Sequence, residues 1–213
     1  MLRRSSIRGS STLLITVIVA ALGLAAVPAH AQASSAEPSR VEFTLSPGGG
    51  IFFQESDAEP AFGNYRLGGG VTVNLTRFVG VEAEVGSSIG ISQQVDFGPT
   101  SGVARKTPNL LDYSPNLVVS ARTGSSVVPY VTGGAGALTV FSREELSIGE
   151  NETYFTGNVG GGVKWFARSG RWGLRGDYRL LAVRSKSDAP EFFGRDTRYA
   201  HRVYGGMIVN LEQ

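Results

Sequence analysis

Apolar and polar side chains alternate through most of the chain after residue 40. Residues 79–86 read VGVEAEVG, with apolar side chains at the odd positions and glycine or glutamate at the even ones. Because successive side chains of a strand point to opposite faces, this period of two predicts strands with one apolar and one polar face. No segment sustains the period of a helix. The pattern predicts eight strands: Val41–Phe53, Tyr65–Leu75, Val79–Ile89, Leu110–Arg122, Val128–Phe141, Thr153–Ala167, Trp172–Val183 and Arg198–Leu211.

The connections between these strands alternate between short and long. Three are short enough for tight hairpins: Thr76–Phe78, Thr123–Val127 and Arg168–Arg171. Four are longer and polar: Gln54–Asn64, Ser92–Asn109, Ser142–Glu152 and Arg184–Thr197. An even number of strands, with short turns at one end and long loops at the other, is typical of an outer-membrane barrel. Glycines recur inside five of the strands, and we interpret them as allowing the strong coiling of a narrow closed barrel.

In such a barrel the apolar face contacts lipid and the polar face lines the lumen. The lumen of an eight-stranded barrel is just wide enough for side chains to fill. Charges buried there are costly unless they are paired, so balanced charges predict a closed, salt-bridged lumen. The residues expected there are Glu42, Arg66, Glu82, Glu84, Asp112, Lys164, Arg175, Asp177, Arg179 and Arg202.

Aromatic residues gather where the predicted strands end. Amphipathic rings favour the two surfaces of a membrane, so they predict two girdles. The girdle beside the short turns is expected to contain Phe78, Tyr130, Trp165, Phe166 and Trp172. The girdle beside the long loops is expected to contain Phe52, Phe53, Tyr65, Phe141, Tyr154, Phe155 and Tyr199.

The first residues predict export. A leader with three arginines precedes an apolar run over residues 12–27, and Ala29 and Ala31 supply the small residues of a cleavage site. We therefore expect a cleaved signal peptide over residues 1–31, a short linker over 32–40 and the barrel over 41–213. The whole chain has 20 basic and 18 acidic residues, and loss of the three leader arginines leaves 17 against 18. The positive charge therefore belongs to the leader and does not indicate nucleic-acid binding. Cysteine is absent, so no disulfide stabilises the exported chain.

Four segments carry a family resemblance. They are VPYVTGGAG at 128–136, GGGVKWF at 160–166, LRGDYR at 174–179 and GGMIVNL at 205–211. With them the chain resembles the small eight-stranded outer-membrane β-barrels that include the barrel of OmpA and the OmpX- and OmpW-like proteins. The resemblance implies an all-β fold, an eight-stranded antiparallel up-and-down transmembrane β-barrel in the bacterial outer membrane. The chain departs from the family at its end, where Gln213 stands in place of the usual aromatic residue.

The resemblance also implies partners. We expect contacts with outer-membrane lipid and lipopolysaccharide, and with periplasmic chaperones and the barrel-assembly machinery during biogenesis. The acidic residues of the first and third long loops suggest solvated charge or divalent cations bridging to lipopolysaccharide phosphates. A monomer is expected, with no cofactor and no metal site.

Two functional classes fit this fold. The first is a non-enzymatic structural and surface-interaction protein that presents four long loops outside the cell. The second is a narrow pore or transporter for small or hydrophobic solutes, as is thought for OmpW-like proteins. The paired lumen charges favour the first class, because a pathway needs an open lumen. A soluble periplasmic lipocalin-like barrel is a more distant alternative.

Catalytic residues are scarce. His201 is the one histidine after the leader, and it lies near Asp196 in the sequence, with Ser142 and Ser185 at the bases of neighbouring loops. A lipid A-modifying hydrolase of the barrel type would need these groups within hydrogen-bond distance of each other. A single histidine in a polar rim is more often a bystander, so the sequence favours a protein that is not an enzyme.

Overall fold

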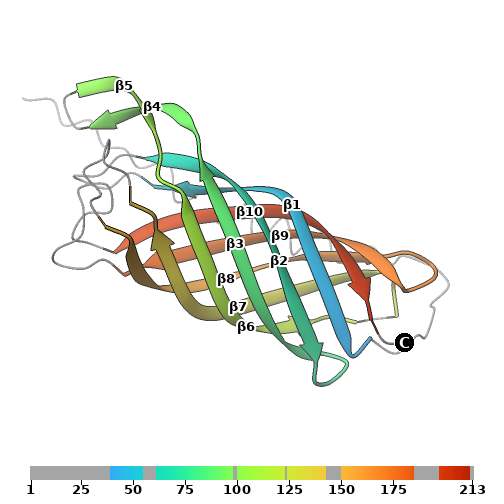
Figure 1. Ribbon diagram of the computed structural model, residues 1–213. Coiled ribbons are helices and arrows are strands. Elements are labelled where there is room, and N and C mark those ends of the chain that lie inside the picture. The colour runs from blue at the N-terminus through green and yellow to red at the C-terminus, as the bar shows by residue number, and fades with distance from the viewer. Residues whose placement is uncertain are drawn as a thin grey trace, which may run out of the picture. The chain divides into compact units, whose positions relative to one another are not determined.

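Eight antiparallel strands close into a barrel in the computed structural model (Figure 1). The structure describes residues 39–54, 61–97, 100–122, 124–142, 150–184 and 197–211. Around the barrel the order is β1-β10-β9-β8-β7-β6-β3-β2, so β1 pairs with both β2 and β10 and closes the sheet. The strands are β1 (Val41–Phe53), β2 (Phe62–Asn74), β3 (Val79–Gly90), β6 (Leu110–Ser120), β7 (Val127–Val140), β8 (Glu152–Phe166), β9 (Trp172–Val183) and β10 (Arg198–Asn210). The predicted fold is confirmed.

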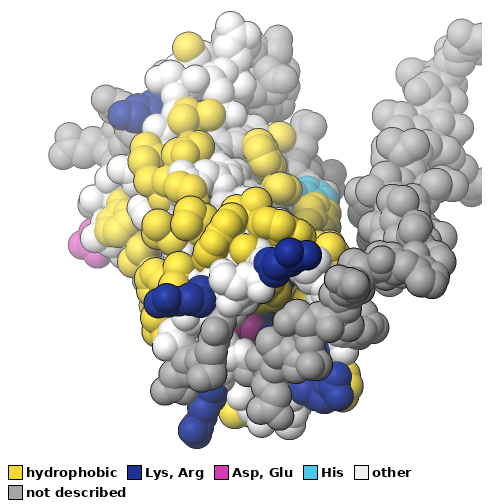
Figure 2. Space-filling model, turned by 90° about the vertical axis from the view of Figure 1, so that its right-hand side faces the viewer, with side chains coloured by type: hydrophobic (Ala, Val, Ile, Leu, Met, Phe, Trp, Pro, Cys, Tyr) yellow, Lys and Arg dark blue, Asp and Glu magenta, His cyan; other side chains and the backbone are white. Residues whose placement is uncertain are grey.

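Polar side chains line much of the barrel interior, and apolar side chains cover its outer surface. In β3 every even residue from Gly80 to Gly90 is buried, whereas the odd residues Val81, Ala83 and Val85 are exposed. The same alternation runs through β6 and β9. Figure 2 shows the resulting band of hydrophobic side chains on the outer surface. No helix in the described part of the chain is long and apolar enough to cross a membrane.

The predicted second long loop contains a hairpin. Strands β4 (Ser92–Phe97) and β5 (Thr100–Lys106) form a separate two-stranded sheet beyond β3, at the loop end of the barrel (Figure 1). Its base is fixed where the Thr107 amide donates a hydrogen bond to the Ile91 carbonyl at 3.1 Å. The long polar connection predicted over Ser92–Asn109 thus contains two strands that the sequence analysis did not expect, and they pair with each other and not with the barrel.

Strand β2 begins three residues earlier than predicted. Phe62 pairs with Phe53 of β1, and their rings stack with centroids 4.5 Å apart. Gly63 and Asn64 resemble loop residues in the sequence, but pairing with β1 and β3 holds them in the sheet.

Short turns join the strands at the opposite end. Gly124 and Gly170 lie in two of them with φ values of 80° and 68°, a backbone conformation that side chains with a Cβ rarely adopt. The three short connections predicted from the sequence lie at this turn end. The predicted signal peptide and linker fall almost wholly outside the described residues; only Ser39 and Arg40, at the end of the linker, are described.

Candidate functional site

Eight charged side chains in the middle of the lumen form one connected ionic network. Four arginines and four carboxylates come from five strands, and all eight are buried. They are Arg66 on β2, Glu82 and Glu84 on β3, Asp112 on β6, Arg175, Asp177 and Arg179 on β9, and Arg202 on β10. The charges of these eight groups balance, so each ion can have a partner of opposite sign. Buried ions require such partners.

Arg179 connects three of the carboxylates. Its Nη2 lies 2.7 Å from Glu82 Oε1, its Nη1 lies 3.0 Å from Glu84 Oε2, and its Nε lies 2.9 Å from Asp177 Oδ1. Arg175 contacts Asp177 at 2.9 Å and also pairs with Glu82. The planar guanidinium has five donors in a fixed fork, so one arginine can hold several carboxylates at once.

The loop-ward half of the network is centred on Asp112. Arg66 donates to it through Nε at 2.9 Å and Nη2 at 2.7 Å, a two-pronged pair, and Arg202 Nη1 donates at 2.9 Å. Glu84 joins this half to Arg179, because it also accepts from Arg66 at 2.9 Å and from Arg202 at 3.2 Å.

A second, smaller cluster lies nearer the turn end. Glu42 of β1 accepts from Lys164 of β8 at 2.5 Å and from Arg122 at 2.5 Å. Asn74 adds a hydrogen bond to the same carboxylate at 2.9 Å. The structure thus places all ten residues expected in the lumen inside the barrel, with Arg122 as a further member.

Two tyrosines complete the central network. The Tyr130 hydroxyl donates to Asp177 at 2.5 Å and accepts from Arg175 Nε at 2.7 Å. Tyr130 is buried, so its assignment to the aromatic girdle was wrong: its position in β7 faces the lumen, as do Val128 and Thr132. Sequence reasoning also missed Tyr204, whose hydroxyl accepts from Arg179 Nη2 at 3.2 Å. It lies two residues after Arg202, and this even spacing was the signal that could have placed it inside.

An apolar layer fills the lumen above the ionic network, at the loop end. Its members are Ile51, Phe53, Phe62, Leu110, Leu138, Val140, Tyr154, Leu181, Val183 and Ala200. Phe53 and Tyr154 were predicted to lie in the loop-end girdle, and both predictions were wrong, because both side chains are buried in this layer. Arg198, another residue that the sequence analysis missed, lies beside the layer and donates to the Gln54 carbonyl at 2.9 Å.

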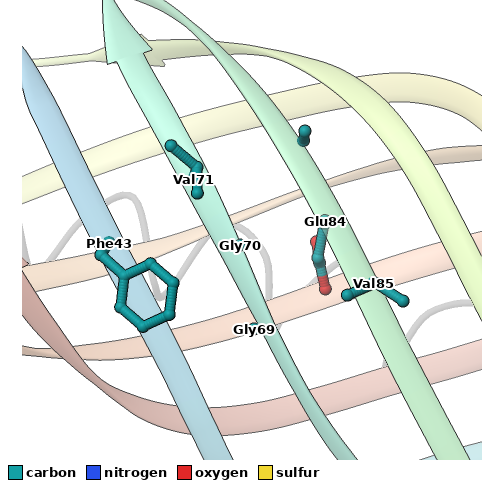
Figure 3. A pocket seen from close by; sticks show the side chains of 7 residues that line it. Phe43, Gly69, Gly70, Val71, Glu84 and Val85 are labelled. Atoms are coloured by element: carbon teal, nitrogen blue, oxygen red, sulfur yellow. The ribbon is translucent and has the colours of Figure 1, made fainter.

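A shallow hollow of about 290 Å³ lies in the wall where β1, β2 and β3 run side by side (Figure 3). Its lining is Phe43, Gly69, Gly70, Val71, Ala83, Glu84 and Val85. Glu84 is its one ionisable group, and that carboxylate is already held by three arginines. Among the described residues, no group of three or more His, Asp or Glu side chains could hold a metal ion.

The comparisons with known proteins agree with this architecture. The family described as "outer membrane protein beta-barrel domain" matches residues 17–200. The chain belongs to this family. It is therefore a bacterial outer-membrane protein, as the sequence predicts.

The solved structure of Neisserial surface protein A shows the same fold, and a second solved structure is similar. Neisserial surface protein A is 13% identical over 81% of this chain and 98% of that one, with a TM-score of 0.58. The N-terminal β-barrel domain of Pseudomonas aeruginosa OprF is 16% identical over 80% of this chain and 98% of that one, with a TM-score of 0.49. No curated protein sequence matches the chain.

Of the aromatic residues assigned to the two girdles, those that face outward lie at the two ends of this outer-membrane barrel. Phe78, Trp165 and Trp172 are exposed beside the short turns, and the two tryptophan rings meet edge to face at 5.7 Å. Phe52, Tyr65, Phe141, Phe155 and Tyr199 are exposed at the loop end. Phe166 was wrongly assigned to the turn-end girdle: it shares the lumen-facing positions of β8 with Lys164, and its ring lies 5.8 Å from the Arg122 guanidinium.

His201 faces outward rather than into the lumen. Its Nδ1 lies 2.6 Å from the Tyr178 hydroxyl, and its Nε2 lies 2.5 Å from Gln54 Nε2. Both ring nitrogens therefore already have neighbours on the outer surface. Of its possible triad partners, Asp196 and Ser185 lie outside the described residues.

Proposed function

We propose that this protein is a monomeric, non-enzymatic outer-membrane barrel with a closed lumen, whose role is to present its long loops at the cell surface. The observation that carries the proposal is the filling of the lumen by two successive layers. The balanced network of Glu82, Glu84, Asp112, Asp177 and four arginines occupies the middle, and the apolar layer occupies the loop end.

The two layers oppose permeation for different reasons. An ion or polar solute crossing the apolar layer would lose its hydration without gaining partners. A solute crossing the ionic layer would have to separate buried ion pairs, and breaking one such pair costs about 3–5 kcal/mol. Chaperones and the barrel-assembly machinery are proposed to act only during biogenesis.

Planar-bilayer recording tests the closed lumen. Protein purified from outer membranes is expected to give no stable unitary openings, under conditions in which a general porin conducts. A matched variant replaces residues 92–106, the β4–β5 hairpin, by an Asn-Gly turn. This variant is also expected to be silent, because closure lies in the lumen and not in the hairpin. Stable openings from the wild-type protein would support the pore or transporter instead.

The same hairpin variant tests whether the loops are separable from the anchor. The β4–β5 sheet pairs with itself and not with barrel strands, so the variant is expected to keep the heat-dependent shift of a folded barrel on a cold-detergent gel. Loss of the shift would show that the hairpin is part of the folding unit and is not a surface element.

The absence of catalysis is tested separately at His201. Hydrolysis of lipid A or peptide by the purified protein is expected to be undetectable. Activity that disappears in His201→Ala would overturn this part of the proposal. Activity that persists in that variant would point to a contaminant or to another group.

A further inference from the structure

Four exposed arginines lie at the turn end of the barrel. Arg40 precedes β1, Arg77 lies in the turn between β2 and β3, and Arg168 and Arg171 lie in the turn between β8 and β9. Arg40 lies beside the end of β2, where the Asn74 amide donates to its carbonyl at 2.9 Å, so Arg40 and Arg77 lie on adjacent strands. Arg168 and Arg171 lie on the β8–β9 turn, which β10 separates from β1 in the barrel order. Figure 2 looks toward this end and shows separate dark-blue Lys and Arg side chains next to the hydrophobic band. We call these four residues the arginine collar.

The described residues near the collar carry no exposed carboxylate. The described parts of the three short turns contain no Asp or Glu, and Glu212 lies outside the described residues. The nearest carboxylate that the structure describes at this end is Glu42, which is buried and already pairs with Lys164 and Arg122. The collar therefore presents positive charge without a carboxylate partner among the residues that the structure describes.

Aromatic side chains indicate how deep the arginine collar lies in the membrane. The Arg77 guanidinium lies 5.0 Å from the ring centroid of Phe78, which is exposed on the outer surface. Arg168 and Arg171 lie in the turn between Trp165 and Trp172. Because exposed aromatic rings of a membrane barrel lie at the level of the lipid headgroups, these guanidinium groups lie at the level of the phosphates.

The backbone of the β8–β9 turn is held in place. The Gly170 amide donates to the Ala167 carbonyl at 2.8 Å, and Asn210 Nδ2 donates to the Gly170 carbonyl at 2.5 Å. The Asn210 amide also donates to the Arg171 carbonyl at 2.9 Å. The turn is thus tied to β10, so the two arginines project from a fixed base beside the tryptophans.

We propose that the arginine collar binds the phosphate groups of anionic phospholipids in the periplasmic leaflet of the outer membrane. Short turns of outer-membrane barrels face the periplasm, and a guanidinium matches the oxygens of a phosphate with two parallel hydrogen bonds. A lipid fits better than a soluble anion, because the neighbouring rings pack against acyl chains and glycerol while the arginines contact the phosphate.

The protein contains its own reporter for this site. Its only two tryptophans are Trp165 and Trp172, on either side of the turn that holds Arg168 and Arg171. Bromine on a lipid acyl chain quenches tryptophan fluorescence at close range, so quenching reports which lipid lies beside this turn. The barrel, purified from outer membranes, is reconstituted in phosphatidylcholine vesicles containing equal fractions of brominated phosphatidylglycerol or brominated phosphatidylcholine. Both leaflets have the same composition, so the direction of insertion does not affect the result.

Brominated phosphatidylglycerol is expected to bind beside the tryptophans roughly fivefold more strongly than brominated phosphatidylcholine for each arginine that engages it. The preference is expected to vanish in Arg168→Gln/Arg171→Gln and to weaken at high salt. The matched control is Arg184→Gln, which removes an exposed arginine at the loop end and is expected to keep the preference.

Three outcomes would overturn the proposal. Equal quenching by the two lipids in the wild-type protein would show that the collar does not select anionic lipid. A preference unchanged in the double variant would place the selectivity elsewhere. Loss of the preference on adding inorganic phosphate at constant ionic strength would identify a site for soluble anions. The substitutions Arg168→Gln and Arg171→Gln both lie at exposed positions of the β8–β9 turn. A cold-detergent gel verifies that the double variant folds.

Discussion

Replacing Arg179 with methionine removes the residue that joins the two halves of the lumen network. Methionine keeps most of the volume of the side chain but removes contacts with Glu82 at 2.7 Å, Glu84 at 3.0 Å and Asp177 at 2.9 Å. Each charged hydrogen bond contributes about 1.5–3 kcal/mol to stability. The sum overestimates the loss, because each carboxylate keeps at least one other arginine.

The net cost is therefore set by the charge imbalance. Four carboxylates would share three arginines in a buried site, and removal of one partner of a buried ion pair costs about 3–5 kcal/mol. We expect Arg179→Met to lower the free energy of unfolding by this amount. Arg179→Lys keeps the charge but lacks the fork, so a smaller loss is expected. Glu82→Gln in the Arg179→Met background restores the balance and is expected to recover part of the loss.

Urea unfolding in phosphatidylcholine vesicles measures the effect, with fluorescence of Trp165 and Trp172 as the signal. Arg184→Gln, at an exposed position of the loop end, is the control and is expected to stay within about 0.5 kcal/mol of wild type. A value for Arg179→Met within about 1 kcal/mol of wild type would refute the reasoning. It would mean that water or rearranged side chains compensate the carboxylates without the arginine.

Two further predictions concern the room and the hydrogen bonds inside the lumen. A Cβ added at Gly86 would overlap the Arg66 guanidinium, so Gly86→Ala is expected to cost about 1–3 kcal/mol in the same assay. Gly176→Ala, where nothing lies within 4 Å of the added atom, is the matched control, and equal effects of the two changes would contradict the steric argument. Tyr130→Phe removes the donor to Asp177 and is expected to cost about 1–3 kcal/mol. An unchanged free energy of unfolding would show that the Tyr130 hydroxyl does not stabilise the network.

Alternation alone predicts much of this fold. Because Glu82 and Glu84 lie on β3, where the period-two pattern is unbroken, the side of the sheet that each occupies follows from its position. The errors arose where nearness to a turn was given more weight than position within the strand. Tyr130 lies close to a short turn and Tyr154 close to a long loop, yet both occupy even positions, in register with lumen-facing neighbours.

Other features depend on pairing between distant strands. The β4–β5 hairpin reads as a polar loop because its residues lack a long apolar face. The sequence also does not predict which ions pair with each other. Arg202 and Asp112, for example, are 90 residues apart and meet only when the barrel closes. Closure also decides the depth of each lumen side chain, which determines whether a charge joins the central network or the Glu42 cluster.

The glycines connect the architecture of the barrel to the side chains that fill its lumen. Strong coiling explains glycine in strands generally, but several positions here have a more local reason. Gly86 and Gly68 face the guanidinium of Arg66, and a Cβ at Gly68 would lie 2.9 Å from its Nη1. A Cβ at Gly162 would lie 2.6 Å from the Tyr130 hydroxyl. The interior of eight strands is too narrow for long side chains to face other side chains everywhere. The long arginines and the tyrosine that occupy the lumen fit because the wall beside them is bare backbone, so the glycine pattern and the ionic network depend on each other.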